Sequence, residues 1–145
     1  MATKNDIEQW FPNIIGKPYK IINSNFNFNC VAFTLDIYDD YVWTTEKSWP
    51  YEIISRQLSV ENFKKLYELY GYEECLDYLY ENEYEKIAFY AKNNQPIHAA
   101  KQVDNAWKSK ISNLIVEHEL DWLCGNTQYA YGDIVFIMKR RIIKK

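Results

Sequence analysis

The spacing of apolar residues changes near the middle of the chain, from a helical repeat in the first half to a two-residue alternation in the second. In the first half, Cys30, Phe33 and Ile37 recur at intervals of three and four residues, which predicts a helix that begins at Cys30. Asn27 or Asn29 can cap its first turn, because a short polar side chain accepts a hydrogen bond from the free N–H groups there. The thiol of Cys30 would therefore lie at the start of a helix.

A longer helix is predicted from Ser59 to Gly71, where the glycine can end it. Its apolar residues form one stripe at helical spacing: Val60, Phe63, Leu66, Tyr67 and Tyr70. The residues before about Asn29 and the aromatic stretch 39–50 show no such repeat, and we expect both to be irregular.

The alternating pattern of the second half predicts strands. They are expected at 86–90, 97–103, 106–111 and 134–143. Asp104 and Asn105 fit a two-residue hairpin turn between the second and third of these strands. A short helix is predicted over 113–123. The pattern indicates an α+β fold of a single domain, residues 1–145, with N-terminal helices packed on a C-terminal antiparallel sheet.

Cys30 and His98 are the residues most suited to catalysis. The positive end of a helix lowers the pKa of a thiol, so the sequence predicts a thiolate at Cys30. His98 lies on a predicted strand beside the small Ala100, which leaves room for a cleft. A cysteine at a helix start and a later histidine on a strand form the minimal layout of papain-like and NlpC/P60-like thiol hydrolases. In that layout Cys30 is the nucleophile and His98 is the general base.

A third catalytic residue should orient the imidazole. With a two-residue turn at 104–105, Ser109 lies on the same sheet face as His98, diagonal to it, and can accept its N–H. His118 is the second candidate, from the predicted helix that follows, where Glu117 is also within reach. Substrate contacts are expected from polar and aromatic side chains near this pair or in the aromatic stretch: Asn29, Trp49, Gln102, Trp107 and Lys110.

Structural roles for the same residues remain open. Cys30 lies on the apolar stripe of its helix, where a buried structural thiol fits equally well. A single strand histidine can be a satisfied polar group, and Cys75 and Cys124 have apolar neighbours and are expected in the core. No Cys-x-x-Cys or His-x-x-x-His spacing occurs, so neither a metal nor a cofactor is expected.

Composition and charge narrow the choice of partners. The net charge of −3 gives no general attraction to nucleic acid or to an anionic membrane. The 13 tyrosines and 5 tryptophans exceed what packing requires and suggest a surface that binds a peptide or protein. The polar N-terminus and the absence of a long apolar run predict neither a signal peptide nor a membrane span. Three unclustered cysteines suit a reducing compartment, so we expect a cytoplasmic protein.

Ordered motifs extend almost from end to end of the chain: Trp10-Phe11-Pro12-Asn13, Asn29-Cys30-Val31-Ala32-Phe33, Trp49-Pro50, Gly71-Tyr72-Glu73-Glu74-Cys75, Glu85-Lys86-Ile87-Ala88-Phe89-Tyr90, His98-Ala99-Ala100-Lys101-Gln102, Trp107-Lys108-Ser109-Lys110-Ile111, Val116-Glu117-His118 and Tyr131-Gly132-Asp133-Ile134. In these motifs the chain resembles a family of small, functionally uncharacterised bacterial and phage proteins. It departs where Ser112 replaces a frequent glycine and Lys101 an arginine. The resemblance implies that the thiol, the imidazole and several strand residues belong to one recurring pattern, but it implies no established activity.

Two hypotheses follow. The first is a papain-like cysteine hydrolase, of peptidase, amidase or thioesterase type, that uses Cys30 and His98 on an amide, isopeptide or thioester bond. The second is a non-catalytic protein-binding module, such as an immunity-type or phage anti-defence protein, whose aromatic surface is the functional part. The sequence leaves the substrate and the oligomeric state open.

Overall fold

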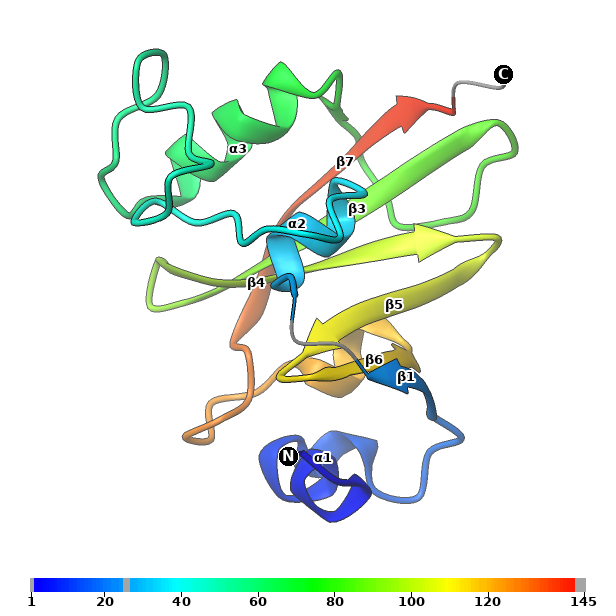
Figure 1. The fold of residues 1–145 in the computed structure, drawn as a ribbon. Coiled ribbons are helices and arrows are strands. Elements are labelled where there is room, and N and C mark those ends of the chain that lie inside the picture. Colours follow the sequence, from blue (N-terminus) through cyan, green and yellow to red (C-terminus); the bar gives the residue numbers. More distant parts are fainter. Residues whose placement is uncertain (1, 25–26, 143–145) are drawn as a thin grey trace.

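The computed structural model describes residues 2–24 and 27–142. Its centre is a seven-stranded antiparallel sheet with the order β1-β6-β5-β4-β3-β7-β2 (Figure 1). The strands are β1 (Lys20–Ser24), β2 (Glu73–Glu74), β3 (Tyr84–Lys92), β4 (Gln95–Val103), β5 (Ala106–Ile111), β6 (Leu114–His118) and β7 (Asp133–Arg141). The helices are α1 (Lys4–Trp10), α2 (Cys30–Thr34) and α3 (Val60–Leu69), with 3-10 turns η1 (Pro12–Ile14) and η2 (Leu120–Leu123). The predicted α+β class is confirmed.

Each face of the sheet carries its own hydrophobic core. On one face, α2 and α3 pack over side chains of β3, β4 and β7, among them Phe89 and Ala99. On the other face, α1, η1 and η2 cover the neighbouring strand residues, among them Ala88 and Ala100. Consecutive residues of a strand point to opposite faces, so neighbours such as Ala88 and Phe89 belong to different cores. Helices therefore cover both faces of the sheet.

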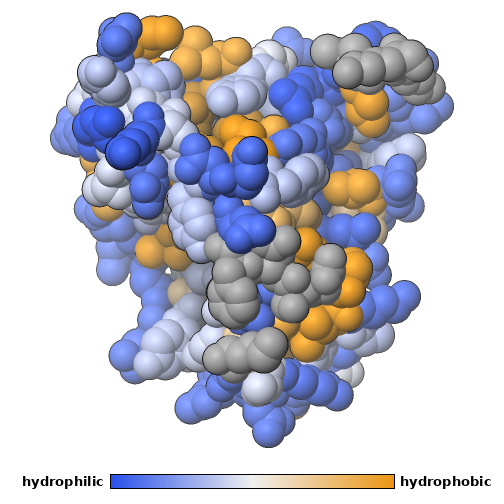
Figure 2. Space-filling model, viewed as in Figure 1, coloured by the Kyte–Doolittle hydropathy of each residue, from blue (hydrophilic) through white to orange (hydrophobic). Residues whose placement is uncertain are grey.

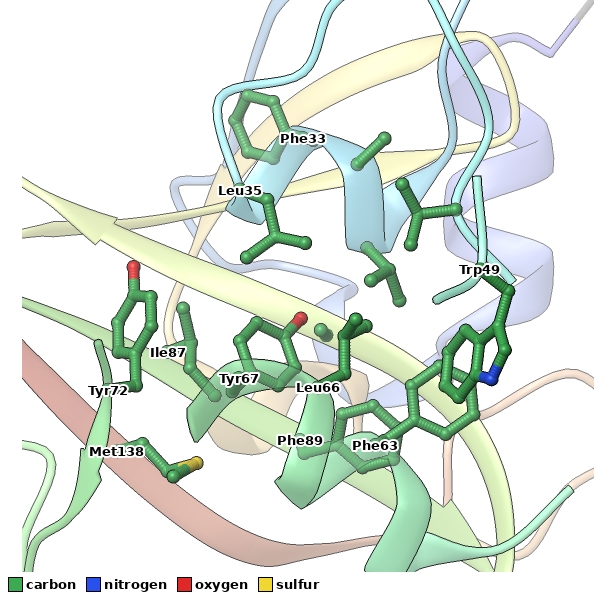
Figure 3. Close-up of a cluster of buried hydrophobic side chains, with 14 of the residues drawn as sticks. Phe33, Leu35, Trp49, Phe63, Leu66, Tyr67, Tyr72, Ile87, Phe89 and Met138 are labelled. Atoms are coloured by element: carbon green, nitrogen blue, oxygen red, sulfur yellow. The ribbon is translucent and has the colours of Figure 1, made fainter. Parts of the chain in front are cut away.

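The helix α3 begins after Ser59 as its sequence predicts, and Phe63, Leu66 and Tyr67 of the expected stripe are buried. Tyr70 follows the last helical residue, Leu69, and is 40% exposed. The Ser59 side chain accepts a hydrogen bond from the N–H of Asn62 and caps the first turn. Phe63 points at Phe89 of β3, with 5.0 Å between the ring centroids, and the side chains of α3 meet those of the sheet in the first core (Figure 3). Beyond the helix, Gly71 has a φ of +88°, a backbone conformation that glycine adopts readily.

The turn between β4 and β5 decides the geometry of the later site. Asp104 and Asn105 both have positive φ, 50° and 67°, as the predicted two-residue hairpin requires. The hairpin then pairs only as far as Lys101 and Lys108, although both strands continue beyond these residues. Figure 1 shows β4 and β5 diverging from their common turn, with α2 beside the opening.

Three sequence predictions need correction. The helix expected over 113–123 is the strand β6 followed by the turn η2, because Leu114, Val116 and His118 alternate with more exposed residues and pair with β5. The region before Asn29 is not irregular, since it contains α1, η1 and β1. The last strand ends at Arg141, and Ile143 lies outside the described residues. None of the helices in the described part of the chain is long and apolar enough to cross a membrane.

A buried hydrogen bond joins the two helices of the first core and gives a test of this packing. The Thr34 hydroxyl donates to the Val31 carbonyl, so it accepts from the Tyr67 hydroxyl at 2.6 Å. We expect Tyr67→Phe to lower the free energy of unfolding by about 1–2 kcal/mol in chemical denaturation. The matched change Tyr51→Phe, at a residue 59% exposed, should have no measurable effect. Equal effects of the two variants would contradict this hydrogen bond.

Candidate functional site

A cavity of about 380 Å³ lies where the start of α2 meets the diverging ends of β4 and β5. We call it the Cys30 cavity. It is lined by Phe28, Asn29, Cys30, Tyr41, Ile97, His98, Lys110, Ser112, Asn113 and Tyr131. The structure therefore brings Cys30 and His98 to one cavity from distant parts of the sequence.

Asn29 fixes the start of α2 through its side-chain amide. Its Oδ1 accepts from the N–H of Ala32 at 3.1 Å and from the N–H of Val42 at 3.0 Å. Its Nδ2 donates to the Val42 carbonyl at 2.9 Å. The predicted cap is thus confirmed, and the same amide ties the helix to the following loop. These contacts position Cys30 at the helix start, and Asn29 itself also lines the Cys30 cavity.

Cys30 and His98 approach the cavity from opposite faces of the sheet. Cys30 packs with the core that contains Ala99, whereas His98 has the strand parity of Ala100 and lies on the other face. They can line one cavity because β4 has no pairing with β5 at this point. The N–H of Ala99, which a continuing ladder would use for β5, instead points at the Cys30 sulfur.

His98 is almost completely buried, with 1% of its surface exposed, and its Nε2 has no hydrogen-bond partner among the residues that the structure describes. The ring of Tyr131 stacks on the imidazole, with centroids 4.3 Å apart, and the Tyr90 ring, which also contacts Tyr131, lies 5.5 Å from the imidazole centroid. Burial lowers the pKa of His98 well below 6.5, and the nearby His118 lowers it further. His98 is therefore a neutral base with a free ring nitrogen.

The thiol of Cys30 is also neutral at rest. Burial raises its pKa above the ordinary value, and this effect outweighs the N–H groups of Ala99 and Val31 and the charge of Lys110, which act in the opposite direction. The thiolate expected from the helix start is thus not supported, because α2 has only five residues and its first turn is buried. No hydrogen bond joins the Cys30 sulfur to His98 among the described residues.

Ser109 does not hydrogen-bond His98 as the sequence suggests. Its hydroxyl lies 2.7 Å from His118 Nε2. His118 Nδ1 faces the Glu119 carbonyl at 2.8 Å and must donate to it, so Nε2 accepts from Ser109. The predicted register is correct, but β5 leaves β4 before Ser109 and pairs with β6 instead. His118 is buried outside the lining of the Cys30 cavity, and burial lowers its pKa to about 4.

The expected substrate-binding residues separate into three places. Trp49 is a core residue whose ring N–H donates to the carbonyls of Ile54 and Ser55, so it does not reach the site. Gln102 and Trp107 line a different cavity of about 280 Å³, near the β4–β5 turn, because they lie on the paired part of the hairpin. Of the strand residues in this group, Lys110 lines the Cys30 cavity.

Asn113 and Tyr131 line the Cys30 cavity and were not expected there. The Asn113 Oδ1 accepts from the N–H of Ala2 at 2.9 Å, but its buried Nδ2 has no partner within residues 2–24 and 27–142. The sequence contains a signal for this residue, since two polar residues between apolar alternations mark a hairpin turn. Tyr131 is placed by Gly132, whose φ is +71° and where an added Cβ would lie 2.3 Å from the Ala91 carbonyl oxygen.

Cys75 and Cys124 are half-buried, as Cys30 is, and neither lines the Cys30 cavity. Cys124 packs against the second core, whereas Cys75 belongs to neither core. Each has a sulfur contact with a backbone carbonyl, that of Asp77 and of Leu120 respectively. In the part of the chain that the structure describes, no group of three or more histidine, cysteine or acidic side chains could hold a metal ion. The Cys30 cavity itself presents a neutral thiol, a neutral imidazole and a lysine.

A family model described as a domain of unknown function (DUF7689) matches residues 20–139, which include every residue lining the Cys30 cavity. A comparison with curated proteins found no significant match, and neither did a comparison with solved structures.

The two histidines give the fold a pH dependence that can be measured. Their folded pKa values are lower than in the unfolded chain, so the unfolded state binds protons more readily as the pH falls below 7. The free energy of unfolding should drop by about 1 kcal/mol for each histidine between pH 7 and 5.5. His118→Gln should remove about half of this slope in denaturation at a series of pH values. A flat profile for the unmodified protein would contradict the burial of both rings as neutral groups.

Proposed function

We propose that this chain, which belongs to the DUF7689 family, is a cysteine hydrolase with a papain-like or NlpC/P60-like layout. It would act on an amide, isopeptide or thioester bond. The observation that carries the proposal is that Cys30 and His98 line one cavity and that the Nε2 of His98 has no hydrogen-bond partner among the described residues. A buried imidazole nitrogen without a partner is costly for a fold that does not use it.

The arrangement of elements supports this layout. The cysteine lies in the first turn of a helix that packs on an antiparallel sheet, and the histidine lies on a strand of that sheet. In such hydrolases the nucleophile and the base come from these two kinds of element. The divergence of β4 and β5 supplies the opening through which the two side chains can meet.

Because the Cys30 thiol and the His98 imidazole are both neutral at rest, the thiol must lose its proton during the attack on the substrate. His98 Nε2 takes the thiol proton as the Cys30 sulfur attacks the substrate carbonyl carbon and forms the C–S bond. The tetrahedral intermediate then expels the amine or thiol, which takes the proton from His98 and leaves an acyl group on Cys30. Water, deprotonated by His98, attacks the thioester, and the carboxylic acid product leaves while the thiol is restored.

Three backbone N–H groups stabilise the negative charge on sulfur during this cycle. Those of Cys30, Val31 and Ala99 all lower the thiol pKa, although burial outweighs them at rest. Hydrogen bonds in catalytic sites often tighten only with substrate bound, so the lack of a Cys30–His98 hydrogen bond in the free protein is compatible with this mechanism.

Transfer of an acyl group to Cys30 tests the proposal directly. We expect an acetyl thioester or p-nitrophenyl acetate to form an acetyl adduct that peptide mapping by mass spectrometry assigns to Cys30. Cys30→Ala should abolish the adduct, and His98→Gln should slow its formation by about 10²–10⁴-fold. Because the His98 pKa is low, the acid limb of the pH–rate profile should lie below pH 6.5. Cys75→Ala is the matched control and should leave the rate unchanged.

The outcome that would refute this function is equally specific. An adduct that forms on Cys75 or Cys124 as fast as on Cys30, with the same rate in His98→Gln, would show ordinary thiol chemistry. Circular dichroism of each variant checks that the fold is retained, because removal of a buried group can by itself lower the free energy of unfolding of a domain by about 1 kcal/mol.

One observation favours the second candidate, a protein-binding module. Residues 76–80 form a loop that exposes large apolar side chains, Leu76, Tyr78, Leu79 and Tyr80. Hydrophobic surface on the face shown in Figure 2 lies in separate patches between hydrophilic residues. A partner that binds this loop would have lower affinity for Leu76→Ser and Leu79→Ser variants and the same affinity for Cys30→Ala. A binding module would form no acyl adduct at Cys30.

A further inference from the structure

Lys110 differs from the other buried lysines of this protein. Its side chain is buried, with 4% of the residue exposed, yet it forms no ion pair with any described residue. By contrast, Lys86 contacts Asp77 and Glu81, and Lys101 contacts Asp36 and Glu85. The Lys110 ammonium donates to the Ser112 carbonyl and lies 5.1 Å from the centroid of the Phe28 ring. It therefore keeps unused donor capacity and an uncompensated positive charge.

An unpaired ammonium is expensive to bury. Burial lowers the pKa of Lys110, although the neighbouring Cys30 partly offsets this effect. Lys110 lines the Cys30 cavity, so a ligand in that cavity could supply the missing negative charge. Such a ligand would offset the free energy that burial of the unpaired ammonium costs. None of the described residues that line this cavity is acidic.

The side-chain amide of Asn113, which also lines the Cys30 cavity, offers a second hydrogen-bond donor for an anionic ligand. Asn113 Nδ2 is buried without a partner, while its Oδ1 is held by the N–H of Ala2. The hydrogen bond to Oδ1 fixes the amide orientation, so the free group is the donor. One ammonium and one amide N–H₂ match a carboxylate, whose oxygens accept from both, whereas a phosphate dianion would leave one charge unpaired.

We propose that the Cys30 cavity binds a carboxylate between Lys110 and Asn113. With the proposed hydrolase function, on which this extension rests, the substrate is an amide, isopeptide or thioester that carries a free carboxylate close to the scissile carbonyl. The binding of a carboxylate itself does not depend on catalysis. The two ideas can therefore fail separately.

Two alkylating reagents that differ only in charge test the proposal. Iodoacetate carries a carboxylate and iodoacetamide a neutral amide, and both alkylate thiols by the same displacement of iodide by sulfur. The ratio of the iodoacetate to the iodoacetamide rate should be about tenfold or more higher at Cys30 than at Cys75 and Cys124, because one favourable charge contact has this effect. Site mapping by mass spectrometry gives all three ratios in one sample.

Lysine variants identify the charge responsible. Lys110→Met should bring the Cys30 ratio to that of the other two thiols, and Lys110→Arg should retain the preference for iodoacetate. Lys108→Met, on the same strand and outside the cavity lining, is the matched control and should change nothing. An unchanged preference in folded Lys110→Met would overturn the proposal.

A binding experiment removes the dependence on thiol reactivity and on the folding of Lys110 variants. In Cys30→Ser, N-acetylglycine should shift the NMR signals of the Asn113 side-chain amide in a saturable way, and neutral N-acetylglycinamide should not. Equal shifts with both compounds, or none with either, would overturn carboxylate binding whatever the alkylation shows. Carboxylate binding without an acyl adduct would refute only the hydrolase, and an acyl adduct without carboxylate preference would refute only the inference drawn from Lys110.

Discussion

The end of the β4–β5 ladder at Lys101 and Lys108 is the constraint on which the rest of the site depends. A strand that leaves its neighbour must find other partners for its backbone groups, because buried N–H and C=O groups are costly when unpaired. Here the start of α2 occupies the opening, and the N–H of Ala99 meets the Cys30 sulfur. The same divergence lets a side chain from the opposite face, His98, reach that space. Without it the sheet would separate the thiol from the imidazole.

The electrostatics of the cavity follow from how deeply these groups are buried. Burial opposes charge on any side chain, so the thiol and the imidazole are both neutral. Among the described residues of the lining, only Lys110 then carries a formal charge. Elsewhere the fold compensates its buried lysines with two carboxylates each. Lys110 differs from Lys86 and Lys101 because no carboxylate of the described residues pairs with its ammonium. Recognition of an anion by the cavity would therefore rest on one residue that the remaining fold leaves uncompensated.

Local patterns predicted much of the fold but only part of the site. The pattern predicts the buried stripe of α3 as far as Tyr67 and the Asp104-Asn105 turn, because helix periodicity and turn chemistry are properties of short segments. It fails at Tyr70, which follows the helix end and is exposed. The segment 113–123 was misassigned because a hairpin turn with Ser112-Asn113 resembles a helix start. The partner of Ser109 could not be predicted, since register arguments assume that a ladder continues, and its end is decided by the packing of α2. The neutral state of Cys30 depends likewise on burial, which no local motif reveals.

The order of the chain has a consequence for how this cavity comes into being. Nearly half of the sequence separates Cys30 from His98, and Asn113 and Tyr131 follow later still. Such a site has a high contact order, so its parts meet only after loop closure over long distances has been achieved. During synthesis the thiol would emerge well before the strands that bury it, and a nascent chain would expose Cys30 as an ordinary cysteine. Completion of the sheet, rather than formation of α2, is thus the step that converts this thiol into a part of the cavity.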